Sequence, residues 1–477
     1  MSVNGVQTSS KSYDAGVNGL PAVQKQPQQA APAADAENNT ARQVNDEEKN
    51  SKTSEARLAG DAMRARLDGE MDSAKAGEAK TQLLASTDAT NPKKLANSSE
   101  ANKKLQEIAA SDPLAYQAIT GSIPKMNDNK KQALIQVIMS PDATPQSIKL
   151  AAESLAGLPE KAHVQSNGKK YTGISFGGDQ SSQDHLKKLK DEGKLGQGEF
   201  DVLMSISKNE GQMNAVNTYD GEVVSFGLRQ NSASGALQPL LKSVRDQNPE
   251  KFKEHFEDKG ISLKEESGRT LLLYKSPSSG KEFKLPDEKK KIPLEDRLHL
   301  ANVFHAASKD PQVSDILNTA QVRSARNSLN QALGTAVAGG SVAQYVTSNR
   351  GKATINDWYN HLPANAKEDF KKSMLDVYSK HGFDTSDPKK LNRDQLTSKV
   401  AEELYQKDHP GAHIPAERMA DYKKMATQQI EEEFIQKTKQ LRMEYFKEKD
   451  PGRVGEIENR YKRVDQYFLS KKNSADA

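Results

Sequence analysis

The chain has 477 residues, of which 34% are hydrophobic and 28% charged, and its formal net charge at pH 7 is +4. This small net charge gives no argument for nucleic-acid binding, which needs a concentrated basic face, and no nucleic-acid partner is expected. The absence of cysteine excludes disulfides, thiolate metal sites and cysteine nucleophiles. No apolar run is long enough to span a membrane, and the N-terminus lacks the basic start and apolar core of a signal peptide. We therefore expect a soluble protein of two to four domains, without membrane insertion.

Residues 1–55 are rich in Ser, Asn, Gln and Ala and have almost no aromatic residue beyond Tyr13. Such a segment buries too little apolar surface to offset its ordering entropy, so we expect a disordered arm. The simplest interpretation is a flexible tail. The composition also resembles the start of type III effectors, which implies export by a type III or type VI route to the periplasm or a target cell. In that case a secretion chaperone or the secretion machinery would be a partner.

Residues 56–96 are charged and alanine-rich, and they predict a marginally helical linker. Residues 97–160 show helical spacing of apolar positions and predict a small domain of three or four short helices, whose role is packing or partner binding. Three proline pairs interrupt this pattern: Asp112-Pro113, Ile123-Pro124 and Ser140-Pro141. Asn167-Gly168 then predicts a hairpin over residues 163–176, and residues 269–285 predict a second hairpin.

The most informative stretch is residues 200–241, where apolar residues follow helical spacing until Glu210 and Gly211 can end the helix. Glu210 then lies on the last turn, where the helix dipole disfavours negative charge and favours a protonated carboxyl if water is excluded. A carboxyl that keeps its proton near neutral pH can donate that proton. Next, Asp220-Gly221 predicts a tight hairpin turn, followed by a strand over residues 223–226.

This sequence of helix, acid, hairpin and helix, with Ser225-x-Gly227-x-x-Gln230, resembles the catalytic segment of the lysozyme-like superfamily. That superfamily includes goose-type lysozymes, soluble lytic transglycosylases and chitosanases. The resemblance covers roughly residues 195–365 and implies a mainly α (α+β) fold, with a catalytic domain over residues 161–365 that carries small β-hairpins. Two departures concern the substrate more than the fold: the gap from Glu210 to Ser225 is long, and Arg229 replaces an apolar residue.

The resemblance implies that Glu210 is the general acid that protonates the leaving oxygen of a glycosidic bond. Asp220 or Glu222 would supply a second carboxylate, and we favour Asp220 because it ends the distinctive run that begins at Asn217. Lytic transglycosylases manage with one glutamate, so hydrolysis and transglycosylation both remain open. Substrate contacts are predicted for Asn217, Tyr219, Glu222, Ser225, Gly227 and Gln230.

A second informative stretch spans residues 345–363, where Ser348 is a candidate N-cap for a helix. Asp357 and Asn360 lie three residues apart, so they share a helix face. They resemble the polar residues of the helix that crosses the cleft in lysozyme-like proteins, and we predict that both contact substrate. The alternative is structural: Asp357 orients His361 or holds Arg350.

Residues 366–477 predict further helices that pack on the catalytic domain, and their dense charges indicate solvated surface helices. His409 and His413 are not expected to bind a metal, because no carboxylate has ligand spacing and Pro410 breaks the helix that would align them. No metal and no cofactor are assigned.

The leading hypothesis is an enzyme that cleaves a glycan polymer, most plausibly peptidoglycan. The alternative is a non-catalytic translocated effector or virion-associated protein that uses a lysozyme-like scaffold for binding. A purely helical adaptor is a third hypothesis, which two hairpins flanking the acid disfavour. If the helices after residue 367 or the N-terminal arm fill the cleft, binding or regulation is favoured.

Overall fold

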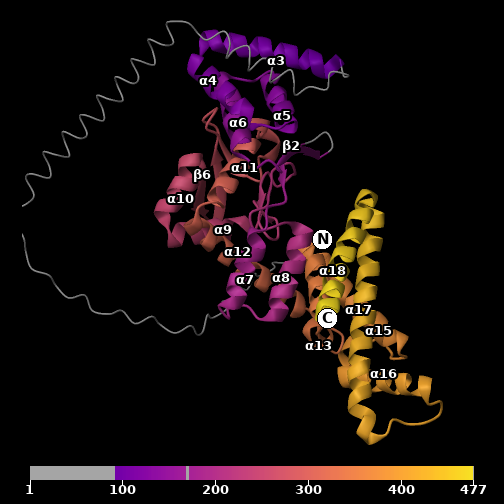
Figure 1. The fold of residues 1–477 in the computed structure, drawn as a ribbon. Coiled ribbons are helices and arrows are strands. Elements are labelled where there is room, and N and C mark those ends of the chain that lie inside the picture. Colours follow the sequence, from indigo (N-terminus) through magenta and orange to yellow (C-terminus); the bar gives the residue numbers. More distant parts are fainter. Residues whose placement is uncertain (1–91, 168–170, 476–477) are drawn as a thin grey trace, which may run out of the picture. The chain divides into compact units, whose positions relative to one another are not determined.

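The computed structural model describes residues 92–167 and 171–475 (Figure 1). The predicted disordered arm over residues 1–55 and most of the predicted linker over residues 56–96 lie outside this range. The described chain is mainly helical with small antiparallel sheets, which confirms the predicted mainly α (α+β) class. None of the described helices has both the length and the apolar character needed to cross a membrane.

Four helices open the described chain: α3 (Pro92–Ser111), α4 (Pro113–Ser122), α5 (Asp128–Ile138) and α6 (Pro145–Gly157). Prolines stand at the first position of α4 and α6, where a missing backbone N–H costs nothing. The side chains of Asp112, Asn127 and Thr144 cap the following helices by accepting backbone N–H groups. These helices share one hydrophobic core with α11 (Leu294–Ala307), against which α6 packs.

A five-stranded antiparallel sheet follows, in the strand order β1-β2-β3-β4-β5. Its strands are β1 (His163–Asn167), β2 (Tyr171–Phe176), β3 (Val216–Asn217), β4 (Ser225–Phe226) and β5 (Asn231–Ser232). The pairing of Asn167 with Tyr171 confirms the first predicted hairpin. A second sheet contains β6 (Ile261–Glu266), β7 (Arg269–Lys275) and β8 (Glu282–Leu285). It confirms the second predicted hairpin and adds β6, which was not predicted.

A turn is present at Asp220-Gly221, where the N–H of Val223 donates to the carbonyl of Asp220 at 3.4 Å, but the predicted tight hairpin is wrong. Strands β3 and β4 pair Val216 with Phe226, so residues 218–224 form a longer connection and the predicted strand over residues 223–226 shortens to β4. Arg297 of α11 donates hydrogen bonds to the carbonyl oxygens of Thr218 (2.7 Å) and Asp220 (3.0 Å) and so fixes this connection.

The remaining α-helices of the described residues follow. They are α7 (Ser181–Asp191), α8 (Gln197–Glu210), α9 (Leu237–Gln247), α10 (Pro249–His255), α12 (Pro311–Leu333), α13 (Val342–Tyr345), α14 (Asn349–His361), α15 (Pro363–Lys380), α16 (Arg393–Asp408), α17 (Met419–Lys449) and α18 (Val454–Ala475). A short ribbon of β9 (Ala336–Val337) and β10 (Gly340–Ser341) precedes α13. Helix α8 packs against α14 and α18, and α18 also contacts α17 (Figure 1). Ser348 caps α14 as predicted, because its hydroxyl accepts the N–H of Gly351 at 2.9 Å.

Candidate functional site

Helix α8 ends at Glu210, as the sequence predicts. Gly211 follows with φ of 127°, and a Cβ at this position would lie only 2.7 Å from Cβ of Ala215, so the exit from the helix requires glycine. The next backbone N–H, that of Gln212, donates to the carbonyl of Gly177 at 2.9 Å and turns the chain towards the sheet. The side chain of Glu210 is 9% exposed.

The two carboxylate oxygens of Glu210 have different surroundings. Arg460 of α18 donates from Nη2 to Oε1, and Asn360 of α14 donates from Nδ2 to the same atom at 3.2 Å. Oε2 accepts no hydrogen bond from the residues that the structure describes. One oxygen is therefore fixed by two donors, and the other is left for a proton or a ligand.

Arg460 is shared between Glu210 and Asp357, and Asp357 also binds Arg442 of α17. The distances from the two arginines to the carboxylate oxygens of Asp357 are both 2.6 Å. Burial opposes the charge on Asp357, but the two guanidinium groups together hold the pKa of this carboxyl well below its usual value. Asp357 is thus committed to an internal ion pair, in place of the predicted substrate contact. Arg350, the alternative partner suggested for it, binds Asp465 at 2.8 Å instead.

The same network orients His361. Arg442 donates from Nη2 to Nδ1 of His361 at 2.6 Å, so this nitrogen acts as an acceptor. Burial, reinforced by the positive charge of Arg460, lowers the pKa of His361 to about 4. The imidazole is therefore neutral at physiological pH, with its proton on Nε2.

Asn360 connects Glu210 to Arg229. Nε of Arg229 donates to Oδ1 of Asn360 at 2.7 Å, which fixes the amide so that its Nδ2 faces Glu210. Arg229 also donates from Nη1 to the carbonyl of Ser324 at 3.0 Å. The two informative stretches of the sequence are thus in direct contact through Asn360 and Glu210. Arg229, noted only as a departure from the family pattern, supports that contact.

The predicted hairpin residues hold their own loop together. Oδ1 of Asp220 accepts the N–H of Glu222 at 2.9 Å, and Oδ2 accepts Nδ2 of Asn217 at 3.1 Å. Glu222 in turn accepts the N–H of Ser234 at 3.2 Å. Burial raises the pKa of Asp220, although the Glu222 N–H opposes this shift. Both oxygens of the predicted second carboxylate are therefore engaged inside the loop.

Tyr219 places this loop near α18. Burial raises the pKa of the Tyr219 hydroxyl, and the negative charges of Asp220 and Glu456 add to the effect. Glu456 lies on the first turn of α18, and its Oε1 is 3.9 Å from Nη1 of Arg460. Its side chain is 46% exposed and pairs with Arg453 at 2.9 Å, and it places a second carboxylate beside the guanidinium that binds Glu210.

The Ser225-x-Gly227-x-x-Gln230 run forms the base of this arrangement. Ser225 is buried in β4, and Gly227 has φ of 82°. A side chain at Gly227 would collide with Gln321 of α12, whose amide accepts the Leu228 N–H at 2.7 Å. Glycine at position 227 therefore lets the backbone pack closely against Gln321, which is a structural role. Gln230 lies beside the end of α8 and donates to the Gly227 carbonyl at 3.3 Å, while its buried Oε1 lacks a partner among the described residues.

The prediction of solvated surface helices at the C-terminal end does not hold for two of their arginines. Arg442 is completely buried, and Arg460 is 3% exposed. Their partners lie on α8 and α14, far away in the sequence, and the local spacing of charges on α17 and α18 gives no sign of them. This is why sequence reasoning missed the two arginines and Glu456.

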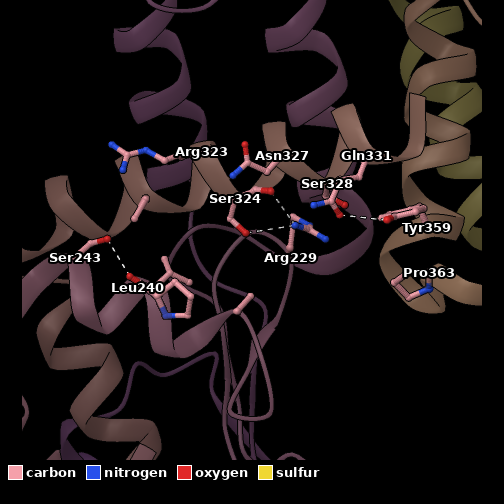
Figure 2. Close-up of a pocket in the computed structure, with 13 residues that line it drawn as sticks. Arg229, Leu240, Ser243, Arg323, Ser324, Asn327, Ser328, Gln331, Tyr359 and Pro363 are labelled. Atoms are coloured by element: carbon pink, nitrogen blue, oxygen red, sulfur yellow. Dashed lines mark hydrogen bonds between the residues drawn. The ribbon is translucent and has the colours of Figure 1, made fainter. Parts of the chain in front are cut away.

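A pocket of about 430 Å³ lies between α9, α12 and α14, next to this network (Figure 2). Its lining includes Arg229, Leu240, Ser324, Asn327, Ser328 and Tyr359. Figure 2 shows the guanidinium of Arg229 pointing towards Ser324 at the pocket wall. Because Asn360 joins Arg229 to Glu210, two hydrogen bonds separate the pocket from the candidate acid.

Glu254, His255 and Asp310 place three potential metal-ligating atoms close together, but an amine already occupies this group. Nζ of Lys251 lies 2.8 Å from Glu254 and 2.9 Å from Asp310. Asp310 also uses its other oxygen to cap α12. The lysine ammonium already binds both acids, so the group does not fit a cation site.

Comparisons of the chain with models of known protein families, with curated protein sequences and with solved structures find no match.

Proposed function

We propose that this chain cleaves glycosidic bonds in a glycan polymer, with peptidoglycan as the first candidate, and that Glu210 is the general acid. The observation that carries this proposal is the asymmetry of the Glu210 carboxyl. Arg460 and Asn360 both bind Oε1, so the side chain is held in one orientation. Oε2 is left without a donor among the described residues, and it is the oxygen that would carry the proton to a leaving group.

The ion pair with Arg460 is compatible with this role because Glu210 is not the main counterion of that arginine. Asp357 lies within 2.6 Å of the same guanidinium and balances its charge. Delivery of a proton from Oε2 would require that a bound sugar weaken the contact between Arg460 and Glu210.

The second role in hydrolysis belongs to a carboxylate that activates water or stabilises the cationic transition state. Asp220 remains a candidate, although donors from its own loop occupy both of its oxygens. Glu456 is a further candidate, because it is half exposed and adjoins Arg460. A transglycosylase would need neither residue, since the substrate's own hydroxyl closes the ring.

The competing proposal is a binding protein with a lysozyme-like scaffold, either a translocated effector or a virion-associated protein. The observation that favours it is the origin of Arg460, which reaches Glu210 from a helix after residue 367. If this ion pair persists with ligand present, Glu210 stays charged and donates no proton.

Incubation with purified peptidoglycan, followed by mass analysis of the soluble products, tests the proposal. Products with reducing ends indicate hydrolysis, and anhydro-sugar ends indicate a lytic transglycosylase. In the hydrolytic case, Asp220→Asn and Glu456→Gln show which carboxylate is needed. If peptidoglycan and chitosan both stay intact, the binding proposal replaces the catalytic one.

A further inference from the structure

The pocket between α9, α12 and α14 contains a cation without an anionic partner. Arg229 makes hydrogen bonds to Asn360 and Ser324, and both partners are neutral. Among the described residues, no carboxylate lies within 4.0 Å of its guanidinium. Charged groups that are removed from water are normally paired, because an unpaired charge there loses its solvation without compensation.

The other two arginines of the neighbouring network contact carboxylates directly. Arg442 binds Asp357, and Arg460 binds both Asp357 and Glu210. Arg229 differs from them, because its guanidinium contacts only neutral groups and it lines the pocket.

A second polar group of the pocket also lacks a partner. Ser328 is 5% exposed, and its hydroxyl makes no hydrogen bond with any described residue. A buried hydroxyl without a partner costs free energy unless a ligand or water satisfies it. The wall formed by α12 and α14 adds the polar side chains of Asn327 and Tyr359, whereas the α9 side presents Pro239 and Leu240.

We propose that this pocket binds a sugar that carries a carboxylate, with Arg229 as the anchor of the acid group. A guanidinium fork matches a carboxylate in shape and charge, the hydroxyl and amide groups of α12 suit ring hydroxyls, and the apolar wall suits a ring face. A volume of about 430 Å³ accommodates one sugar ring with its substituents. The pocket geometry supports the binding of an anion. The inference that a sugar carries this anion rests on the proposed function.

Two sugars that differ by one acidic substituent provide a matched test. We would titrate the full chain with N-acetylmuramic acid and, in parallel, with N-acetylglucosamine, which lacks the lactyl carboxylate, and follow binding by calorimetry and by the shift in Tm. The wild type is expected to bind the acid at least about tenfold more tightly than the neutral sugar, as loss of a charge-assisted hydrogen bond implies. Arg229→Gln should remove this preference.

Two further variants separate loss of the site from loss of folding. Ala320→Met narrows the pocket without touching the arginine network and should weaken binding of the acid. Arg269→Gln removes the same charge from an exposed residue of β7 that does not line the pocket, and it should bind like the wild type. Equal binding of the two sugars, no binding of N-acetylmuramic acid, or an equal loss in Arg269→Gln and Arg229→Gln would overturn the proposal. The titration requires no bond cleavage, so it stands or fails independently of peptidoglycan release.

Discussion

Arg460 of α18 donates a hydrogen bond to Glu210 of α8, although the two residues lie 250 positions apart in the chain. The same guanidinium binds Asp357 of α14, so three helices meet at one buried charge. The orientation of the candidate acid therefore depends on the C-terminal helix, and the catalytic proposal requires that helix to be present.

Arg460→Gln should lower the free energy of unfolding by about 3 to 5 kcal/mol. The change leaves Glu210 and Asp357 buried with one arginine fewer between them, and breaking one side of a buried ion pair is costly. Urea denaturation measures the effect. Arg453→Gln is the control, because Arg453 immediately precedes α18 and forms an exposed ion pair with Glu456. This change should lower the free energy of unfolding by no more than about 1 kcal/mol. Similar losses in both variants would contradict a special role for Arg460.

Asn360→Ala should reduce the rate of glycan cleavage by about tenfold to a hundredfold, with a smaller effect on KM. The alanine removes a hydrogen bond that holds Oε1 of Glu210, and misplacement of a proton donor mainly slows the chemical step. Asn330→Ala, at an exposed position of α12, should retain the wild-type rate. A wild-type rate in Asn360→Ala would show that Glu210 does not need this bond.

His361 predicts a specific pH dependence of stability. Its pKa is about 4 in the folded protein and about 6.5 in the unfolded chain, so between these values the unfolded chain binds more protons. The contribution of neutral His361 to the free energy of unfolding is present above pH 6.5. It is lost as the pH falls from 6.5 to 4, by up to about 3 kcal/mol. His361→Gln keeps an acceptor for Arg442 and should flatten the unfolding free energy over this range.

The control for this series is His413→Gln, which changes an exposed histidine. Its unfolding free energy should follow the wild-type curve between pH 4 and 7. If His361→Gln also followed that curve, the histidine would not be held neutral by its surroundings.

Gly227→Ala should lower the free energy of unfolding by about 1 to 3 kcal/mol, because φ is 82° and a Cβ would meet the side chain of Gln321. Gly221→Ala is the control, in the connection between β3 and β4 that precedes Gly227. A Cβ there finds Nζ of Lys289 at 3.5 Å, an ordinary contact, so the change should stay within about 0.5 kcal/mol. Thermal and chemical unfolding compare the two. Equal stabilities would argue against the fit between Gly227 and Gln321.

Local signals in the sequence were sufficient for some features of this site and insufficient for others. The end of α8 at Glu210 and the Ser348 cap of α14 follow from a glycine and a serine next to periodic apolar residues, and both are confirmed. The turn at Asp220 is present, but it lies within a longer connection between β3 and β4, whose carbonyls bind Arg297 from a distant helix.

Charge partners that come together only in the folded chain could not be predicted. A charged residue of a helix can face water or a carboxylate on another helix, and the spacing of charges along the helix sequence is the same in both cases. Arg442 and Arg460 are buried because Asp357 and Glu210 lie opposite them. The residue spacing within α17 and α18 cannot predict these partners, since they lie on other helices. Asn360 was predicted at the site and lies there, but as a partner of Glu210 and Arg229.

The central claim is that Glu210 delivers a proton, and peptidoglycan release by Glu210→Gln tests it most directly. Glutamine can still accept the bonds of Arg460 and Asn360 on one oxygen but carries no acidic proton at the other position. The matched control is Glu199→Gln, which removes a carboxylate paired with Arg326 at the opposite end of the same helix. The account predicts no soluble product from Glu210→Gln and wild-type release from Glu199→Gln, with both proteins folded. Undiminished release from Glu210→Gln would contradict it.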